Sequence, residues 1–140
     1  MPQTTVREVM TEKPVALQAG TTLVEAARAM RDHDVGNVVM LEEDRVAGIV
    51  TDRDMVVRAI ADGWDPATTV LSQISSRDLV TVAPGEPVDT AVELMRRNMV
   101  RRLPVVENGR PIGIISLGDL AVERDMQSVL GQISAASPNR

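Results

Sequence analysis

The sequence contains a seven-residue stretch, Gly48-Ile49-Val50-Thr51-Asp52-Arg53-Asp54, that returns 65 positions later as Gly113-Ile114-Ile115-Ser116-Leu117-Gly118-Asp119. Residues 14–57 around this stretch align with residues 79–122 without a gap, and 12 of the 44 aligned pairs are identical. Glycine, methionine and aspartate positions all keep their register. Because self-similarity at a fixed period is the signature of repeated structural units, we predict that this chain is built from two copies of one unit.

The repeat predicts a first unit at residues 4–62, a connector at 63–68, a second unit at 69–125 and a C-terminal tail at 126–140. A unit of about 60 residues buries too little surface to be stable alone. We therefore expect the two units to pack with pseudo-twofold symmetry into one module. Apolar spacing predicts the order helix, strand, helix, strand, strand, helix in each unit, which is an α/β (α+β) fold class.

The expected strands are short apolar runs, at residues 15–17, 38–41 and 47–50 in the first unit and at residues 79–82, 103–106 and 112–115 in the second. Two closing helices are expected at residues 52–62 and 117–125, and a short helix in the tail at residues 129–133. The closing helices carry many apolar side chains, which predicts a homodimer contact, because exposed apolar patches mark subunit interfaces. These side chains are Met55, Val56, Ala59, Ile60, Leu120 and Ala121.

Composition excludes several classes of function. The chain carries a net charge of −5, has no Phe or Tyr and only one Trp, and so lacks the clustered basic and aromatic residues of nucleic-acid binding proteins. It has no Cys and one His, which excludes a zinc site of the usual nitrogen and sulfur type. No apolar run reaches the roughly 18 residues of a membrane helix, and the amino terminus has no signal-peptide pattern. We expect a cytoplasmic protein without a membrane partner.

The Thr51–Asp54 and Ser116–Asp119 pairs have two interpretations. Each places a hydroxyl at the end of a predicted strand and a carboxylate three positions later, which is the spacing of a helix capping box. The same arrangement suits a nucleotide, because a helix amino terminus attracts phosphate and a carboxylate accepts hydrogen bonds from vicinal ribose hydroxyls. No glycine-rich phosphate loop or dinucleotide motif accompanies either pair.

Together, these motifs resemble the cystathionine β-synthase (CBS) domain family over about residues 4–125. The resemblance rests on the two Gly-to-Asp stretches at 48–54 and 113–119, on residues 6–15, and on the Val-Arg-Arg-Leu-Pro-Val-Val run at 100–106. It extends to small stand-alone bacterial CBS pairs associated with stress or hypoxia. It implies a disc-like homodimer whose clefts between the two units bind an adenosine-containing ligand, such as AMP, ADP, ATP or S-adenosylmethionine, without turnover and without a required cofactor.

The resemblance also implies the ligand-binding residues. Asp54 and Asp119 would hold ribose, Thr51 and Ser116 would face ribose or phosphate, and the backbone around Val15 and Val80 would meet the adenine edge. Main chain near residues 35–38 and 100–103 would form the remaining walls. The full implied set is Val15, Asn37, Thr51, Arg53, Asp54, Val80, Arg101, Arg102, Ser116, Gly118 and Asp119, with no catalytic and no metal-binding residue.

The two predicted sites differ in charge. Arg101 and Arg102 stand where the first copy has Gly36 and Asn37, and Asp52 stands where the second copy has Leu117. Arginine suits charge-assisted contacts with phosphate, so we expect a phosphate-bearing ligand to prefer the site with Ser116 and Asp119. The arginine pair could equally be a solvated surface.

Two other classes of function stay open. The first is a ligand-free interaction protein or stress-associated structural dimer, with an unidentified protein partner, in which both hydroxyl–carboxylate pairs only cap helices. The second is an enzyme, which the sequence does not favour because no nucleophile–base pair or metal cluster is visible. Trp64 in the connector fits either a sealed joint between units or subunits, or a stacking surface for a base.

Overall fold

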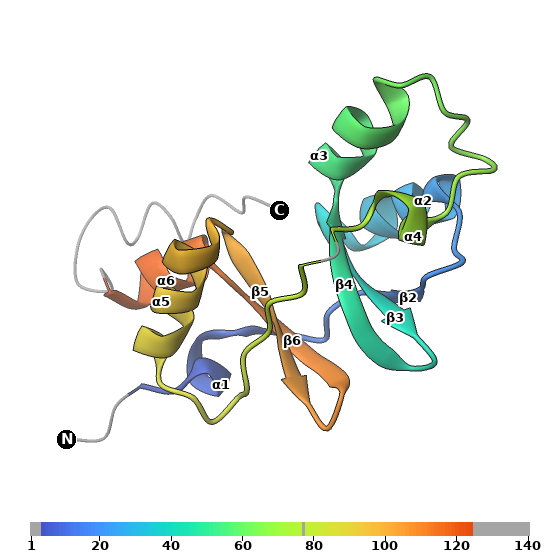
Figure 1. The fold of residues 1–140 in the computed structure, drawn as a ribbon. Coiled ribbons are helices and arrows are strands. Elements are labelled where there is room, and N and C mark those ends of the chain that lie inside the picture. Colours follow the sequence, from blue (N-terminus) through green and yellow to red (C-terminus); the bar gives the residue numbers. More distant parts are fainter. Residues whose placement is uncertain (1–3, 77, 125–140) are drawn as a thin grey trace. The chain divides into compact units, whose positions relative to one another are not determined.

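In the computed structural model, residues 4–76 and 78–124 are described, and they form two compact units of mixed helix and sheet (Figure 1). We call them the Asp54 unit, made of residues 14–76, 78–79 and 109–111, and the Asp119 unit, made of residues 4–13, 80–108 and 112–124. The predicted α/β class is confirmed. The helix predicted at residues 129–133, like the rest of the 126–140 tail, lies outside the described residues.

The Asp54 unit is built around a three-stranded sheet in the order β2-β3-β4. Strand β2 (Ala16–Gln18) runs parallel to β3 (Asn37–Glu42), and β3 runs antiparallel to β4 (Arg45–Thr51). Helix α2 (Leu23–His33) connects the parallel pair, as a crossover between parallel strands requires. After β4 come α3 (Asp52–Met55), the π-helical turn η1 (Val56–Ile60) and α4 (Leu71–Ile74).

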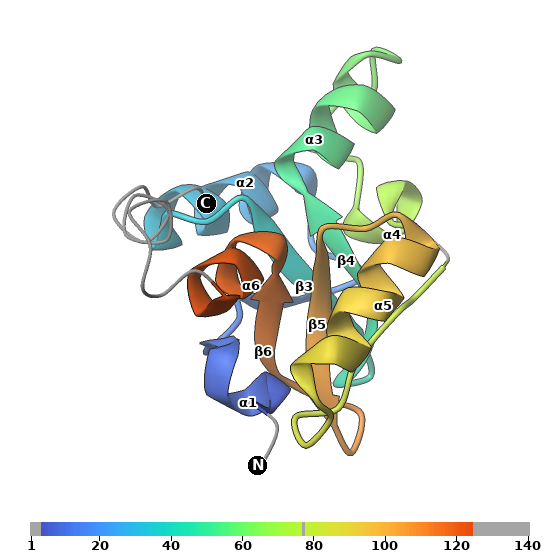
Figure 2. The same ribbon diagram turned by 90° about the vertical axis from the view of Figure 1, so that its left-hand side faces the viewer.

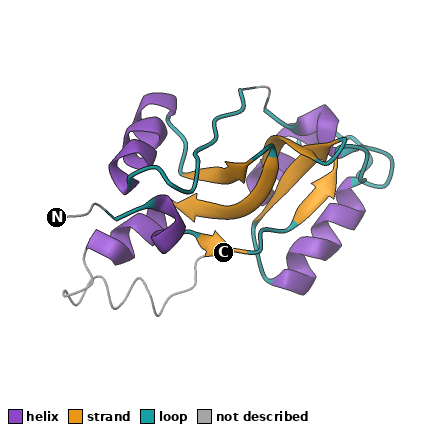
Figure 3. Ribbon diagram, turned by 90° about the horizontal axis from the view of Figure 1, so that it is seen from below, coloured by secondary structure: helices purple, strands orange, loops and turns teal. Residues whose placement is uncertain are grey.

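The Asp119 unit also has a three-stranded sheet, in the order β1-β6-β5, but its third strand β1 pairs antiparallel with the second strand of the hairpin. Its strands are β1 (Thr11–Glu12), β5 (Arg102–Glu107) and β6 (Arg110–Ser116), the last beginning in residues grouped with the other unit. Its helices are α1 (Val6–Val9), α5 (Val88–Asn98) and α6 (Leu117–Arg124), which contact one another beside the β5–β6 hairpin (Figure 2). Figure 3 separates the helices and strands of both units by colour.

Each unit takes its short opening helix from the other repeat. Helix α1 comes from the first repeat, yet its backbone is bonded to the Asp119 unit. Val6 N donates to Glu86 O at 2.9 Å, and Arg7 N donates to Pro84 O at 3.0 Å. Helix α4 opens the second repeat, yet Leu71 N donates to Thr21 O at 3.0 Å in the Asp54 unit. The two repeats therefore exchange their first segments.

Each core is built on a helical stripe of buried apolar residues. In the Asp54 unit, α2 buries Leu23, Ala26 and Met30 against the sheet, and in the Asp119 unit α5 buries residues 88, 91 and 95 in the same spacing.

Helix α2 begins at a capping box in which Thr22 pairs with Glu25. The hydrogen bonds from the Thr22 side chain and backbone lower the pKa of Glu25.

Two predicted elements are wrong in detail. The strand expected at residues 79–82 is reduced to one bridge between Val82 and Val105. Val82 is buried at this bridge, whereas Leu79 is 40% exposed and pairs with no strand. The closing helix expected at residues 52–62 is a short α-helix that widens into a π-helical turn and ends at Ile60. The closing helix predicted at residues 117–125 is found at Leu117–Arg124.

Gly113 provides a test of how tightly β1 packs on β6. A Cβ atom at Gly113 would lie 2.5 Å from Met10 Sδ and 2.9 Å from the carbonyl oxygen of Thr11, which is backbone and cannot rotate away. We expect Gly113→Ala to lower the free energy of unfolding by about 1–3 kcal/mol through overpacking. Denaturant unfolding followed by circular dichroism measures this.

The repeat supplies the matched control at Gly48. A Cβ atom at Gly48 would lie 3.3 Å from the flexible methyl of Met40 and 3.7 Å from the carbonyl oxygen of Ser76. Gly48→Ala should therefore lower the free energy of unfolding clearly less than Gly113→Ala does. Equal losses for the two substitutions would show that the packing of β1 on β6 is not as close as described.

Candidate functional site

The Asp54 unit places a hydroxyl and a carboxylate at the junction of β4 and α3. Thr51 N donates to Asp54 Oδ2 at 2.9 Å, and Asp54 N donates to Thr51 Oγ1 at 3.1 Å, so the two residues form the predicted capping box. Asn37 is the strand partner of Thr51 in the β3–β4 ladder. The ladder and the cap therefore bring three of the predicted binding residues together.

The second oxygen of Asp54 stays outside the cap. Arg58 Nε lies 3.7 Å from Asp54 Oδ1, and the Asp54 side chain is 25% exposed. The carboxylate is therefore held in one orientation by its Oδ2 atom while its Oδ1 atom remains within reach of a ligand. A fixed carboxylate with one accessible oxygen suits hydroxyl groups as donors.

The Asp119 unit repeats the junction between β6 and α6. Ser116 N donates to Asp119 Oδ2 at 2.9 Å, and Asp119 N donates to Ser116 Oγ at 3.1 Å. Leu117 N donates to the Arg101 carbonyl oxygen at 2.8 Å, which ties the junction to the segment before β5. Asp119 Oδ1 accepts a hydrogen bond from Thr11 Oγ1 at 3.4 Å.

The helix amino termini differ between the two junctions. In α3, the Asp52 carboxylate accepts a hydrogen bond from Arg53 N at 2.8 Å and so occupies an amide that a phosphate would need. In α6, the residue that corresponds to Asp52 is Leu117, which has no carboxylate. The Gly118 N–H has no hydrogen-bond partner within the part of the chain that the structure describes. Among the described residues of the two junctions, the free amide at the helix amino terminus is therefore found at the Asp119 junction.

The remaining predicted residues occupy the surroundings of these junctions. The Val15 carbonyl oxygen accepts a hydrogen bond from Val39 N at 2.8 Å, and Val80 is partly buried in the other unit. Arg53 and Arg101 are exposed, and Arg102 is partly buried as the first residue of β5. No described ion pair involves these three arginines, so their guanidinium groups are available to an anion.

Two residues at the junctions were not predicted from the sequence. Arg58 follows Asp54 at helical i,i+4 spacing, a signal that could have been used. Thr11 reaches Asp119 across 108 positions of the chain, and only the exchange of opening segments brings it there. Neither residue was part of the predicted set, and both contact the carboxylate oxygen that the cap leaves outside.

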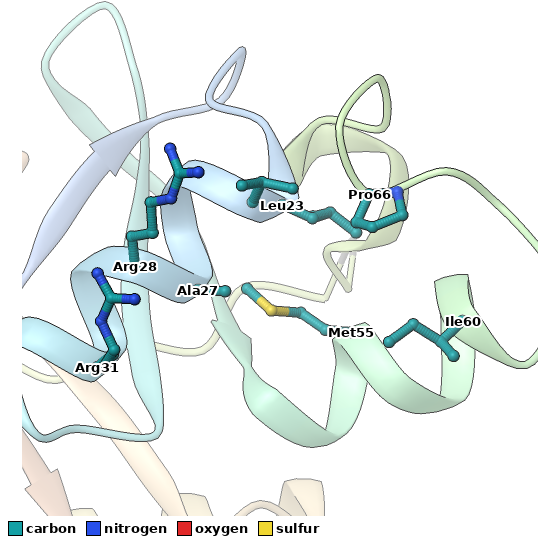
Figure 4. Close-up of a pocket in the computed structure, with 8 residues that line it drawn as sticks. Leu23, Ala27, Arg28, Arg31, Met55, Ile60 and Pro66 are labelled. Carbon is teal, nitrogen blue, oxygen red and sulfur yellow. The ribbon is translucent and has the colours of Figure 1, made fainter.

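The Asp54 unit also has an apolar groove that contains none of the predicted binding residues. It measures about 380 Å³, and Arg28 and Arg31 extend from α2 along it (Figure 4). Its lining residues are Leu23, Val24, Ala27, Arg28, Arg31, Met55, Ile60 and Pro66. Beside it, Val56, Val57 and Ile60 of η1 are each about half exposed, at 49–57%.

The apolar surface of the closing helices is narrower than predicted. Met55, Ala59 and Leu120 are buried within their own units, because they complete the two cores. Of the predicted contact residues, Val56 and Ile60 are exposed, and Ala121 is partly buried. An apolar contact surface therefore remains on η1 and along the groove.

Comparison with known proteins identifies the family. The model of the CBS domain matches residues 6–60 and 71–124, so the chain belongs to the CBS domain family and is a pair of CBS domains. It is 37% identical over 119 residues to the CBS domain-containing protein YhcV of Bacillus subtilis, which covers 85% of this chain and 84% of that protein.

A second relative is Hypoxic response protein 1 of Mycobacterium tuberculosis, 32% identical over 119 residues, covering 84% of this chain and 83% of that protein. The crystal structure of Hypoxic Response Protein I with two coordinated zinc ions matches with a TM-score of 0.76 and 31% identity, over 86% of this chain and 98% of that one. The CBS domain pair of MJ0100, in complex with 5-methylthioadenosine and S-adenosyl-L-methionine, matches with a TM-score of 0.80 and 23% identity, over 91% and 100% of the two chains.

The crystal structure of Hypoxic Response Protein I contains two coordinated zinc ions. The single histidine of the present chain, His33, has its Nδ1 atom 2.9 Å from the Ala29 carbonyl oxygen at the end of α2. Among the residues at 4–76 and 78–124, no three His, Asp or Glu side chains are grouped closely enough to hold a metal ion. Those same residues also form no helix that is long and apolar enough to cross a membrane.

Proposed function

We propose that this CBS pair is a regulatory sensor module that binds an adenosine-containing ligand, such as AMP, ADP, ATP or S-adenosylmethionine, without turnover. The observation that carries the proposal is the repeated geometry at the two strand–helix junctions. In each junction, the Oδ2 atom of the aspartate accepts the hydrogen bond of the helix cap. The Oδ1 atom lies 3.7 Å from Arg58 Nε in the Asp54 unit and 3.4 Å from Thr11 Oγ1 in the Asp119 unit. Vicinal ribose hydroxyls suit such an acceptor.

Support also comes from the solved CBS pair of MJ0100, which holds two adenosine derivatives. In the proposed binding mode, Asp54 and Asp119 accept from ribose, Thr51 and Ser116 lie beside the ribose or phosphate, and the backbone near Val15 and Val80 meets the adenine edge. No cofactor is required. The predicted cytoplasmic location is part of the proposal.

A thermal-shift panel of adenosine, AMP, ADP, ATP and S-adenosylmethionine tests the proposal. A ligand that binds only the native state raises its stability by RT ln(1 + [L]/Kd), which is about 2.7 kcal/mol at a concentration of 100 Kd. We expect at least one member of the panel to raise the Tm in a dose-dependent manner. Guanosine and GMP serve as controls, because they share the ribose and phosphate but present a different base edge.

A phosphate-bearing ligand should prefer the Asp119 unit. Its α6 amino terminus has the unpartnered Gly118 amide, and Arg101 and Arg102 stand where the other repeat has Gly36 and Asn37. Replacing both arginines by glutamine should weaken AMP binding by about tenfold, since hydrogen bonds to charged groups contribute roughly 1.5–3 kcal/mol. Adenosine, measured by the same calorimetric titration, should lose much less.

Salt provides a second readout of this preference. AMP affinity should fall as ionic strength rises, because charges on an exposed surface are screened over about 8 Å at physiological salt. Equal losses of AMP and adenosine in the double variant, or a bound structure with phosphate only beside Thr51, would contradict the assignment.

A homodimer is the second part of the proposal. The observation that supports it is the apolar groove beside η1, where Val56, Val57 and Ile60 expose about half of their surface. Exposed apolar patches of this kind mark protein contacts, and a second copy of the chain presents the same apolar residues for burial. If the adenosine panel shows no binding, the same surface favours the alternative of a ligand-free interaction protein with a different protein partner.

A further inference from the structure

Arg58 lies beside the carboxylate oxygen that the proposed ligand would use in the Asp54 unit. Its Nε atom lies 3.7 Å from Asp54 Oδ1, and its Nη1 atom donates to the carbonyl oxygen of Ile74, at the end of α4, at 3.3 Å. The other oxygen of Asp54 already accepts from Thr51 N at 2.9 Å. A ribose hydroxyl that approaches Asp54 therefore meets a guanidinium group that is held in place from two sides.

The other repeat lacks this arrangement. The position that corresponds to Arg58 is Glu123, and the Oδ1 atom of Asp119 faces the hydroxyl of Thr11 at 3.4 Å. A threonine hydroxyl is neutral, and it can rotate to accept a hydrogen bond after it has donated one. A guanidinium group only donates and always carries its charge. A ligand hydroxyl thus has a weaker competitor at Asp119 than at Asp54.

We propose that Arg58 is a specificity-determining residue that weakens the binding of neutral ribosyl ligands at Asp54, because it competes with their hydroxyl groups for Oδ1. This inference rests on the proposed function. It predicts that the two sites are unequal even for a ligand without phosphate, and that adenosine fills the Asp119 site first. Binding at Asp54 releases Arg58 from the carboxylate while its bond to the Ile74 carbonyl remains.

Calorimetric titration of the full chain with adenosine tests the role of Arg58. In an Asp119→Ala background the remaining binding reports on the Asp54 site, which a further Asp54→Ala substitution should remove. Adding Arg58→Gln to the Asp119→Ala protein should raise adenosine affinity about twofold, the size expected for an exposed ion pair one helical turn apart. Arg58→Lys, which keeps the charge, should stay near the parent value.

Glu123→Gln is the matched control, made in the Asp54→Ala background at the corresponding position of the other repeat. It should leave adenosine affinity at the Asp119 site unchanged within a factor of about 1.3, because no ion pair of Asp119 is present among the described residues. Salt gives an independent signature. Affinity at Asp54 should rise with ionic strength when Arg58 is present, since screening weakens its pair with Asp54, and should be flat after Arg58→Gln.

The outcomes separate this inference from the proposed function. If adenosine binds through Asp54 equally well or more weakly after Arg58→Gln, with no salt signature, the role of Arg58 is overturned while the proposed function stands. If adenosine binding is unaffected by Asp54→Ala, Asp119→Ala and their combination, the proposed function is wrong and this inference falls with it.

Discussion

Asp119→Ala should weaken the binding of an adenosine-containing ligand by about 1.5–3 kcal/mol, or roughly tenfold to a hundredfold, because a charged hydrogen-bond acceptor for ribose is lost. Asp54→Ala should have an effect of the same kind on the second, weaker site. Isothermal titration with AMP measures both. Two-site binding in the parent should become one-site binding in each single variant.

The capping role of Asp119 requires its own control. The Asp119 carboxylate also accepts a hydrogen bond from Ser116 N at 2.9 Å, so its removal disrupts the helix cap as well as the proposed binding site. Asp119→Asn keeps an oxygen for the cap and removes the charge. We expect it to restore most of the Tm but not the affinity, whereas a purely structural role would restore both together.

Ile60→Glu should convert the proposed homodimer into monomers at micromolar concentration. Ile60 is 57% exposed and lines the apolar groove of the Asp54 unit, so the substitution leaves the unit's own core intact. Burial of an unpaired charge in an apolar contact costs several kcal/mol, which is comparable to the whole energy of a modest interface. Light scattering or analytical ultracentrifugation reports the change in mass.

Ala61→Glu is the matched control for this substitution. Ala61 is exposed and adjacent to Ile60, but it does not line the groove. The same charge at residue 61 should leave the dimer in place. A parent protein that is monomeric at micromolar concentration would contradict the proposed assembly, and so would two variants that both dissociate.

The sequence predicted the parts of the fold whose signals are local. The helical spacing of Leu23, Ala26, Ala27 and Met30 predicted α2 with one buried stripe. Three of the four residues are buried, whereas Ala27 is exposed. The Asn108-Gly109 pair is a typical hairpin-turn sequence, and both residues have positive φ. Glu43 and Asp44 adopt the same left-handed conformation without glycine, which the strand pairing on either side imposes and residue preference alone does not indicate.

The same division applies to the candidate site. Both hydroxyl–carboxylate pairs were predicted, because their geometry depends on four consecutive residues at a strand–helix junction. Thr11 could not be predicted beside Asp119, since that contact depends on α1 and β1 packing in the unit of the opposite repeat. The single bridge between Val82 and Val105 in place of the strand expected at residues 79–82 could not be predicted either, because apolar residues alone do not indicate whether a pairing strand lies beside them.

Binding of an adenosine-containing ligand through the two aspartates is tested by calorimetric titration of AMP into the parent chain and into the Asp54→Ala, Asp119→Ala double variant. We expect saturable binding to the parent and binding that is at least about tenfold weaker to the double variant, with circular dichroism showing that both are folded. Absence of binding to the parent at millimolar AMP, adenosine and S-adenosylmethionine would contradict the account, as would equal affinity for the parent and the double variant.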